Sequence, residues 1–425
     1  MKKVLLIAFY FNQTNEIASK RLRGLGKYLP KYGWEPVILV PNLGENNENK
    51  NDINCKIIET PYEDMIEKWM PKKNKKNETN NIKPIKDSKD TNNKALSKLI
   101  SIAGEIFAYP DGMKYWYKPA ITESSKIIEE ENINAIISSS FPITSHLIGK
   151  ELKNKYNIPW IADLRDLWNT NPYINHTHIR NFFEMRLEKN TLSQANALTT
   201  TSQLAAEQLQ KLHPTQEIKA ILNGYDPEEI KLIKNNPQKN NKLNLTYAGS
   251  LYSGKRNPEI LFKAISDLIK EGKIQKDKIE LNFYGDNSNL EILKNKYQLT
   301  DNVKINGFIP HEEVLKKQNQ SDILLLISWN NPKEKIFIPG KVYEYIGLQH
   351  PVLSIGYKEG SLKDLINDTN IGKHTTDIET LKKALIDYYN EFDKTGQIKF
   401  EPKENINKYS IENMALEFSK LLNKM

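Results

Sequence analysis

The 425-residue sequence has few of the features that mark several classes of protein. Its one cysteine, Cys55, excludes a disulfide framework within the chain and is typical of a reducing compartment. No stretch approaches the roughly 20 apolar residues of a membrane-spanning helix, and the longest candidate, Leu99 to Tyr109, contains Glu105. The N-terminal apolar run spans about eight residues and no small-residue cleavage site follows it, so we expect a buried first strand there.

Sequence motifs of several enzyme classes are also missing. The nearest match to the G-x-G-x-x-G dinucleotide fingerprint, Gly24 to Leu29, comes too late after the first strand and lacks the third glycine. The chain has no P-loop, no G-x-S-x-G and no His-rich metal spacing. His176 and His178 are two residues apart, which places them on different faces of a helix and disfavours a metal site. These absences argue against a nucleotide-dependent oxidoreductase.

Charge of one sign is concentrated in a single segment. The net charge is +8, and residues 68–98 alone contain ten lysines against the three acids Glu78, Asp87 and Asp90. This Lys/Asn-rich composition buries little apolar surface and predicts a mobile insertion. Elsewhere the signs nearly balance, and we expect no nucleic-acid partner. A solvated loop is the simpler interpretation of the insertion, and contact with anionic lipid head groups is the functional alternative.

What is present is a repeated alternation of short β-branched runs and longer helical stretches. The composition, with 38% hydrophobic and 9% aromatic residues, is that of a globular protein, and the length favours two domains. The pattern predicts an α/β fold with two doubly wound, Rossmann-like domains. The strands are expected at 4–10, 36–40, 55–59, 135–139, 160–163, 197–200, 220–222, 243–248, 279–284, 303–306, 323–327 and 352–355, and the helices at 18–32, 122–131, 144–156, 179–194, 258–270, 310–319 and 411–423.

A polar segment, residues 233–242, separates the two series and is the expected linker. The expected domains are therefore residues 1–232 and 243–405, followed by a C-terminal helix within 406–425. That helix has an apolar stripe that includes Met414, Phe418 and Leu421. We interpret the stripe as a core face rather than as a membrane anchor, and we expect the helix to pack back toward the first domain.

Two such domains usually bind a ligand at the carboxyl ends of their strands, so functional residues are expected in the loops that follow strands. In one of these loops Lys255 and Arg256 stand just before Pro258, at a helix start. Two cations beside a helix N-terminus suit a diphosphate. A solvated basic turn is the alternative.

A second loop carries Gly340 and Lys341 at the start of a short helix that Pro351 ends. Glu344 falls in the first turn of this helix. A carboxylate there can accept hydrogen bonds from hydroxyl groups such as those of a ribose, or it can simply offset the helix dipole. The window alone leaves both interpretations open.

An ordered set of stretches in the second half resembles the donor-binding domain of retaining glycosyltransferases of family 4, which have the GT-B fold of two domains facing a cleft. These stretches are YAGSLYSGKRNPEILFKAI (247–265), FYGDN (283–287), VKINGFIPHEEVLKKQNQSDILLLIS (303–328) and GKVYEYIGLQHPVL (340–353), preceded by ILNGYDPEEI (221–230). The first half resembles a subgroup with an Asp-x-Arg-Asp-x-Trp element, here DLRDLW (163–168), and with SSSFPITSHLIGKEL (138–152).

The resemblance implies roles on the donor side. Glu344 matches a family glutamate that contacts the ribose, but the glutamate expected eight positions earlier is replaced by Ile336, and Glu334 is out of register. Lys255 matches the family lysine on the diphosphate, while Ser250 stands at the arginine position, so we expect Arg256 to substitute. Lys255, Arg256 and Glu344 are the expected catalytic residues. The nucleotide-binding residues are expected to be Gly249, Ser250, Tyr284, Gly285, Asp286, Gly307, Phe308, Ile309, Gly340 and Lys341.

On the acceptor side, the resemblance and the position in loops select five residues. These are Arg21, His146, Asp163, Arg165 and Asp166. The alternative for DLRDLW is an internal ion pair that fixes the loop.

The resemblance implies retaining transfer of a sugar from a nucleotide diphosphate sugar, with UDP as the commonest nucleotide, to a glycan or lipid-linked acceptor in surface polysaccharide or glycoconjugate synthesis. Cations aimed at the leaving diphosphate lower the barrier, and Lys255 and Arg256 would do so without a metal cofactor. The expected location is the cytoplasm, with the basic insertion in contact with the inner face of the membrane. A non-catalytic nucleotide-binding scaffold, suggested by Ile336, and a sugar-nucleotide epimerase of the same fold are the alternatives.

Overall fold

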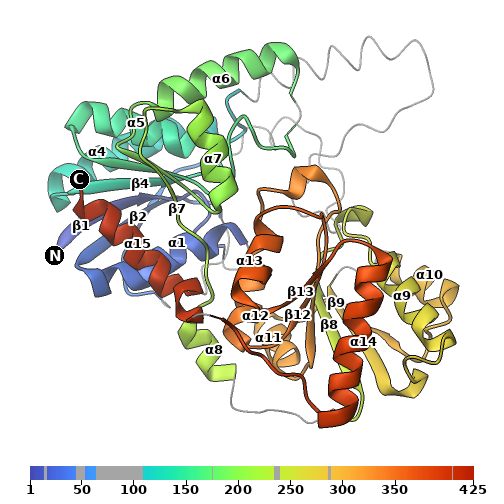
Figure 1. Cartoon of the computed structure of the whole chain (residues 1–425). Coiled ribbons are helices and arrows are strands. Elements are labelled where there is room, and N and C mark those ends of the chain that lie inside the picture. The colour runs from blue at the N-terminus through green and yellow to red at the C-terminus, as the bar shows by residue number, and fades with distance from the viewer. Residues whose placement is uncertain are drawn as a thin grey trace. The chain divides into compact units, whose positions relative to one another are not determined.

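The computed structural model describes residues 1–13, 17–44, 53–63, 109–174, 176–233, 240–285, 289–403 and 405–425. Two compact units emerge from its contacts, each built on one sheet (Figure 1). The first comprises Met1–Thr200, Gln208–Lys219 and Ser419–Met425, and the second Thr201–Glu207 and Ala220–Phe418. The prediction of two doubly wound α/β units is confirmed. The basic insertion, residues 68–98, lies outside the described residues.

The first unit holds a seven-stranded sheet in the order β3-β2-β1-β4-β5-β6-β7, parallel from β3 to β6. Its middle strands are buried on both faces because helices cover the sheet. The strands are β1 (Lys2–Ile7), β2 (Trp34–Pro41), β3 (Lys56–Thr60), β4 (Ala135–Ser139), β5 (Trp160–Leu164), β6 (Ala197–Thr200) and β7 (Ile218–Ala220). The helices of this part of the chain are α1 (Ile17–Tyr28), α4 (Tyr117–Glu131), α5 (Thr144–Tyr156), α6 (His178–Leu192) and α7 (Gln203–Leu212).

The second unit holds a six-stranded parallel sheet in the order β10-β9-β8-β11-β12-β13. Its strands are β8 (Leu243–Gly249), β9 (Ile279–Gly285), β10 (Val303–Ile305), β11 (Ile323–Ile327), β12 (Val352–Ile355) and β13 (Gly372–Thr375). The helices are α8 (Pro227–Ile233), α9 (Glu259–Lys270), α10 (Leu290–Lys296), α11 (His311–Asn319), α12 (Lys341–Leu348), α13 (Ser361–Thr369), α14 (Ile378–Thr395) and the first part of α15 (Ile411–Asn423). One apolar core lies on each face of this sheet.

The predicted strands are found in the structure, most within two residues of their expected bounds. The sequence pattern missed β13, the 18-residue α14 and the shorter helices α7, α8, α10 and α13. The sequence of β13 is GKHT, in which apolar and polar residues do not alternate as they do in a typical half-buried strand. α14 begins at a capping box in which the Asp377 carboxylate accepts from the Thr380 amide at 2.9 Å. Asp-x-x-Thr is not the Ser/Thr-x-x-Glu signature that marks most such helix starts.

The unit boundary falls before the expected linker. Residues from Ala220 onward belong to the second unit, because Ile230 and Ile233 of α8 pack in the same core as Ile346 of α12. The chain end, Ser419–Met425, belongs to the first unit, where the Trp34 indole Nε1 donates to Asn423 Oδ1 at 3.0 Å.

The apolar stripe of α15 is buried, as expected of a core face. Met414, Phe418 and Leu421 are each at most 2% exposed. Within the described part of the chain, no helix is both long enough and apolar enough to span a bilayer.

Candidate functional site

The carboxyl ends of β8, β9 and β10 meet at three glycines. Gly249 and Gly285 are register partners, and the Gly285 amide donates to the Gly307 carbonyl oxygen at 2.7 Å. All three have positive φ, at 133°, 108° and 70°, which residues with a Cβ rarely adopt. A Cβ on Gly285 would lie 2.8 Å from the Gly249 oxygen. Glycine therefore allows these strand ends to turn and approach one another closely.

Helix α12 is joined to the end of β8 by Lys341. The Lys341 Nζ donates to the Ala248 carbonyl oxygen at 2.6 Å and lies 4.3 Å from the centroid of the Tyr247 ring. A Cβ on Gly249 would come within 2.6 Å of the same Nζ, so the ammonium occupies space that only glycine leaves open. The first turn of α12 is thus held against the end of β8, where a ligand of a parallel sheet is expected.

The charge on Lys341 is sensitive to its surroundings. Burial, together with the nearby positive charge of Arg256, lowers its pKa to about 7, while the Glu344 carboxylate acts in the opposite direction. An anion bound here would stabilise the ammonium form. Lys341, Arg256 and Glu344 therefore form one electrostatic group, as expected for three of the predicted donor-side residues.

The loop after β8 presents the two predicted cations at its surface. Lys255 is exposed, with its Nζ 5.2 Å from the centroid of the Trp329 ring, and the half-buried Arg256 has its Cζ 4.2 Å from the Tyr252 ring centroid. Ser250 serves the turn itself, since its Oγ accepts from the Tyr252 amide at 3.1 Å. Both cations therefore lie against aromatic rings, in cation–π contacts.

Glu344 lies beside the basic side chains of Lys341 and His311 rather than at an exposed helix end. Its side chain is 17% exposed, and Oε1 is 3.8 Å from Nε2 of His311. The same His311 nitrogen lies 3.2 Å from Oε1 of Glu229 on α8. Sequence reasoning did not single out His311, although it follows Pro310 at the start of α11. A helix-dipole role alone does not require such neighbours.

The expected base-binding residues follow β9 and β10. Tyr284 is half-buried, and burial raises the pKa of its hydroxyl. Phe308 is 84% exposed, an unusual position for a phenyl ring, and Ile309 is half-buried beside it. Asp286 lies outside the described residues.

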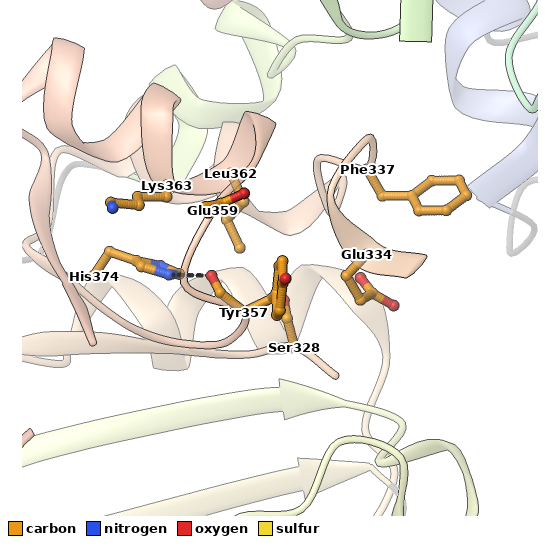
Figure 2. A pocket seen from close by; sticks show the side chains of 8 residues that line it. All are labelled: Ser328, Glu334, Phe337, Tyr357, Glu359, Leu362, Lys363 and His374. Atoms are coloured by element: carbon orange, nitrogen blue, oxygen red, sulfur yellow. Dashed lines mark hydrogen bonds between the residues drawn. The ribbon is translucent and has the colours of Figure 1, made fainter. Parts of the chain in front are cut away.

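Glu334 lies in a small pocket at the ends of β11 to β13, shown in Figure 2. Burial raises the pKa of its carboxyl to about 7. Ser328 also lines the pocket, and its buried Oγ has no hydrogen-bond partner among the described residues. On the opposite wall His374 Nε2 bonds the Tyr357 carbonyl oxygen at 2.9 Å, which requires a proton on Nε2. Its Nδ1 then accepts from Ser354 Oγ at 3.0 Å.

Ile336, where the resemblance expects a glutamate, is half-buried and contributes its backbone. Its carbonyl oxygen accepts from Ser202 Oγ at 2.6 Å. The Phe337 ring next to it is turned away from the rest of the pocket in Figure 2. Position 336 therefore contributes a backbone oxygen to a structural hydrogen bond, and its isoleucine side chain cannot take the place of the expected carboxylate.

Two of the expected acceptor-side residues form a buried ion pair. Arg21 Nη2 and Nε bond Asp163 Oδ1 and Oδ2 at 2.9 and 3.0 Å, and both residues are at most 3% exposed. Asp163 also accepts from Ser139 Oγ and Thr199 Oγ1. Burial opposes ionisation of Asp163, but the Arg21 charge and the hydrogen bonds from Arg21, Thr199 and Ser139 together outweigh it and lower the carboxyl pKa. We interpret Arg21 and Asp163 as a structural pair, in place of the expected acceptor contacts.

His146 is likewise part of the core. It is fully buried, with Nδ1 2.8 Å from Ser138 Oγ, and that oxygen accepts from the Trp160 indole. Burial lowers the His146 pKa to about 4, so the ring is neutral at physiological pH. We therefore interpret His146 as a core residue, in place of the expected contact with an acceptor.

Arg165 and Asp166 follow Asp163 in the DLRDLW element, just after β5, and both are half-buried. Arg165 Nε donates to the Ser140 carbonyl oxygen at 2.9 Å, and burial raises the Asp166 pKa. The internal ion pair considered for DLRDLW therefore exists, but it joins Asp163 to Arg21 rather than to Arg165.

Comparisons with known proteins agree with this description. Residues 242–391, within the second unit, match the family model described as Glycosyl transferases group 1. No curated protein sequence matches the chain. In the described ranges, no three His, Cys, Asp or Glu side chains gather where a metal ion could be held.

The structure is similar to Anabaena HepE in complex with UDP, with a TM-score of 0.63, 14% identity and 100% of both chains covered. It is also similar to sucrose-phosphate synthase from Thermosynechococcus elongatus, with a TM-score of 0.62, 14% identity and coverage of 100% and 99%. UDP-GlcNAc 2-epimerase from Methanocaldococcus jannaschii gives 0.52 and 11% identity, with 100% of both chains covered. The fold is GT-B.

Proposed function

We propose that the protein is a glycosyltransferase that moves a sugar from a nucleotide diphosphate sugar to a glycan or lipid-linked acceptor, with retention of anomeric configuration. One observation carries the proposal: Lys341 connects the Gly249 turn to the first turn of α12, which brings Arg256 and Glu344 into one electrostatic group. This group lies in the region that matches the glycosyltransferase model. A UDP-sugar is the favoured donor, because the similar HepE structures contain UDP and UDP-glucose.

In this proposal Glu344 accepts hydrogen bonds from the ribose hydroxyls and Phe308 offers its exposed face to the base. Lys255 and Arg256 leave their aromatic neighbours to contact the diphosphate. Breaking the bond between the anomeric carbon and the phosphate oxygen leaves a dianionic group on the nucleotide. Cations fixed beside that oxygen stabilise the charge as it develops. We propose that these side chains act without a metal ion, and that the leaving phosphate accepts the acceptor's proton.

The test is the stability of the protein in the presence of nucleotides. A nucleotide at 100 times its dissociation constant raises the free energy of unfolding by about 2.7 kcal/mol. We expect UDP to raise the melting temperature of the wild type and to leave Glu344→Ala nearly unchanged. Glu379→Ala is the matched control, because Glu379 is also an acid in the first turn of a helix but lies on α14. A loss of the UDP effect in both variants would contradict a specific role of Glu344.

A non-catalytic nucleotide-binding protein is the second candidate, favoured by Ile336 in place of the expected glutamate. Incubation with UDP-glucose, UDP-galactose and UDP-N-acetylglucosamine separates the two candidates. Release of UDP from one of these donors, abolished in Glu344→Ala, supports an enzyme. UDP binding without release from any donor supports the second candidate.

A further inference from the structure

Helix α6 presents its apolar side chains outward. Ile179, Phe182 and Phe183 are 74%, 64% and 53% exposed, and Met185 is 38% exposed. Residues 179, 182 and 183 are spaced as neighbours on one helical face. The helix lies at the periphery of the first unit (Figure 1). Large apolar side chains gathered on one exposed face mark an interaction surface.

The polar face of α6 points inward instead. Glu184 and Glu188 are at most 2% exposed. Glu184 accepts from Arg180 Nε at 2.8 Å and from the Trp168 indole at 2.7 Å. Glu188 accepts from the Asn169 amide at 3.0 Å. The acids of this helix are therefore neutralised or hydrogen-bonded inside the unit, and they contribute no negative charge to its outer face.

The charges that remain on the outer face are positive. Arg186 follows Phe182 and Phe183 by one turn, and both Arg186 and Lys189 are exposed. Lys150 of α5 adds a third cation at the same end, since its Nζ donates to Asn190 Oδ1 at 3.2 Å. Phenyl and aliphatic side chains beside cations, without acids, are the pattern of helices that lie in the interface of an anionic bilayer.

Tyr109 contacts α6 through its side chain. Tyr109 is the first described residue after 64–108, and its hydroxyl donates to the Phe183 carbonyl oxygen at 3.4 Å. In sequence, the ten lysines and three acids of residues 68–98 precede Tyr109 by only eleven positions. Tyr109 therefore contacts the helix that carries the exposed phenyl rings.

We propose that the outer face of α6, formed by Ile179, Phe182, Phe183, Met185, Arg186 and Lys189, binds the surface of an anionic lipid bilayer. The phenyl rings enter the boundary between head groups and acyl chains, and the cations contact lipid phosphates. A second copy of the chain is a poorer occupant, because a two-fold interface would bring together two copies of a face that carries cations and no acids. The proposal stands on α6 alone and does not require the donor site to be active.

Vesicle co-sedimentation tests the apolar part. We expect the full chain to bind phosphatidylcholine vesicles that contain phosphatidylglycerol, and to bind pure phosphatidylcholine vesicles much less. The variant Phe182→Ser/Phe183→Ser should lose at least about tenfold in the partition coefficient, since each ring removes a large apolar area from water. Ile292→Ser is the matched control, because Ile292 on α10 is 66% exposed and should not affect binding.

A charge pair of variants tests the electrostatic part. Arg186→Gln/Lys189→Gln should lower the partition coefficient about fivefold for each cation. Lys383→Gln/Lys394→Gln removes two exposed cations from α14 and should leave binding unchanged. Equal melting temperatures, and equal stabilisation by UDP, show that a variant is folded and that its donor site is intact.

Three results would contradict the proposal that α6 binds an anionic bilayer. No binding of the wild type to anionic vesicles overturns the proposal, as does equal binding of wild type and Phe182→Ser/Phe183→Ser. If the phenylalanine variant instead changes the oligomeric state in solution without changing vesicle binding, the face contacts a second copy and not a lipid surface.

Discussion

Lys341 combines two properties that rarely occur together in a lysine. Its ammonium is hydrogen-bonded to a backbone carbonyl oxygen, yet burial and the Arg256 charge lower its pKa to about 7. The unfolded chain keeps the ordinary value of 10.5. Between these two values the unfolded state binds more protons than the folded state, so this residue makes the protein more stable as the pH rises.

We therefore predict a pH-dependent effect of Lys341→Met. The free energy of unfolding of the wild type, relative to the variant, should rise from about pH 7 to pH 10 and stay constant below pH 7. Denaturant titrations across this range measure it, with Lys383→Met on the surface of α14 as the control. A difference between wild type and variant that does not vary with pH would show that Lys341 keeps an ordinary pKa.

Glu334 should give the opposite sign. Burial raises the pKa of its carboxyl from 4.5 to about 7, so between these values the folded state binds more protons than the unfolded state. The wild type should lose stability as the pH rises through this window, and Glu334→Gln, which cannot ionise, should lose less. Unfolding curves at pH 4.5, 6 and 7.5 check the prediction, and identical slopes against pH for the two proteins would rule it out.

The Arg21–Asp163 pair should dominate the local stability of the first unit. Asp163→Asn leaves the buried Arg21 guanidinium without its counter-charge, which typically costs about 3–5 kcal/mol. The exposed pair of Lys126 and Glu123 provides the comparison, because Glu123→Gln removes a surface ion pair of little worth. Guanidinium unfolding measures both. A loss below about 1 kcal/mol for Asp163→Asn would show that the buried arginine is readily rehydrated.

Among the secondary-structure elements, β8 and β9 matter most to the site, because their C-terminal ends approach each other closely at Gly249 and Gly285. Gly285→Ala places a Cβ 2.8 Å from the Gly249 oxygen at a φ of 108°. Strained backbone of this kind costs on the order of 1–3 kcal/mol, and the displaced Gly249 turn should also abolish stabilisation by UDP. Gly272→Ala is the control for strain alone, since Gly272 has a φ of 64° and a Cβ there would meet no atom within 4 Å. Retained UDP stabilisation in Gly285→Ala would separate the turn from the binding site.

At the scale of the whole molecule, each unit has its own sheet, and the proposed donor site uses residues of the second unit. Hydrogen exchange should therefore show UDP-dependent protection at residues 249–256, 307–309 and 340–344. The amides of β5 in the first unit should exchange at the same rate with and without UDP, because their protection depends on a different sheet. Protection that is strongest in β5 would place the nucleotide elsewhere.

The fold class and most of the strands could be predicted from the sequence alone. Buried parallel strands are continuous apolar runs, such as residues 323–327, and these are visible without any contact information. Three of the expected donor-side residues, Arg256, Lys341 and Glu344, were selected because they lie near glycines or helix starts, and they interact electrostatically in the structure. Their role in donor binding stays a prediction. β13 was missed because four residues show little pattern, whereas α14 was missed although its apolar residues recur at helical spacing, at Leu381, Ala384, Leu385, Tyr388, Tyr389 and Phe392.

Which polar residues are structural became clear from the three-dimensional contacts and not from the sequence pattern. Arg21 and Asp163 are 142 positions apart, and a sequence pattern cannot show that they share a buried ion pair. His146 was a candidate by its place after a strand, yet packing against Ser138 and Trp160 makes it a core residue. The inverted polarity of α6 was equally hidden, since the direction of a helical face depends on which distant groups bind its acids. Local pattern fixes elements, whereas burial and pairing over long sequence distances fix roles.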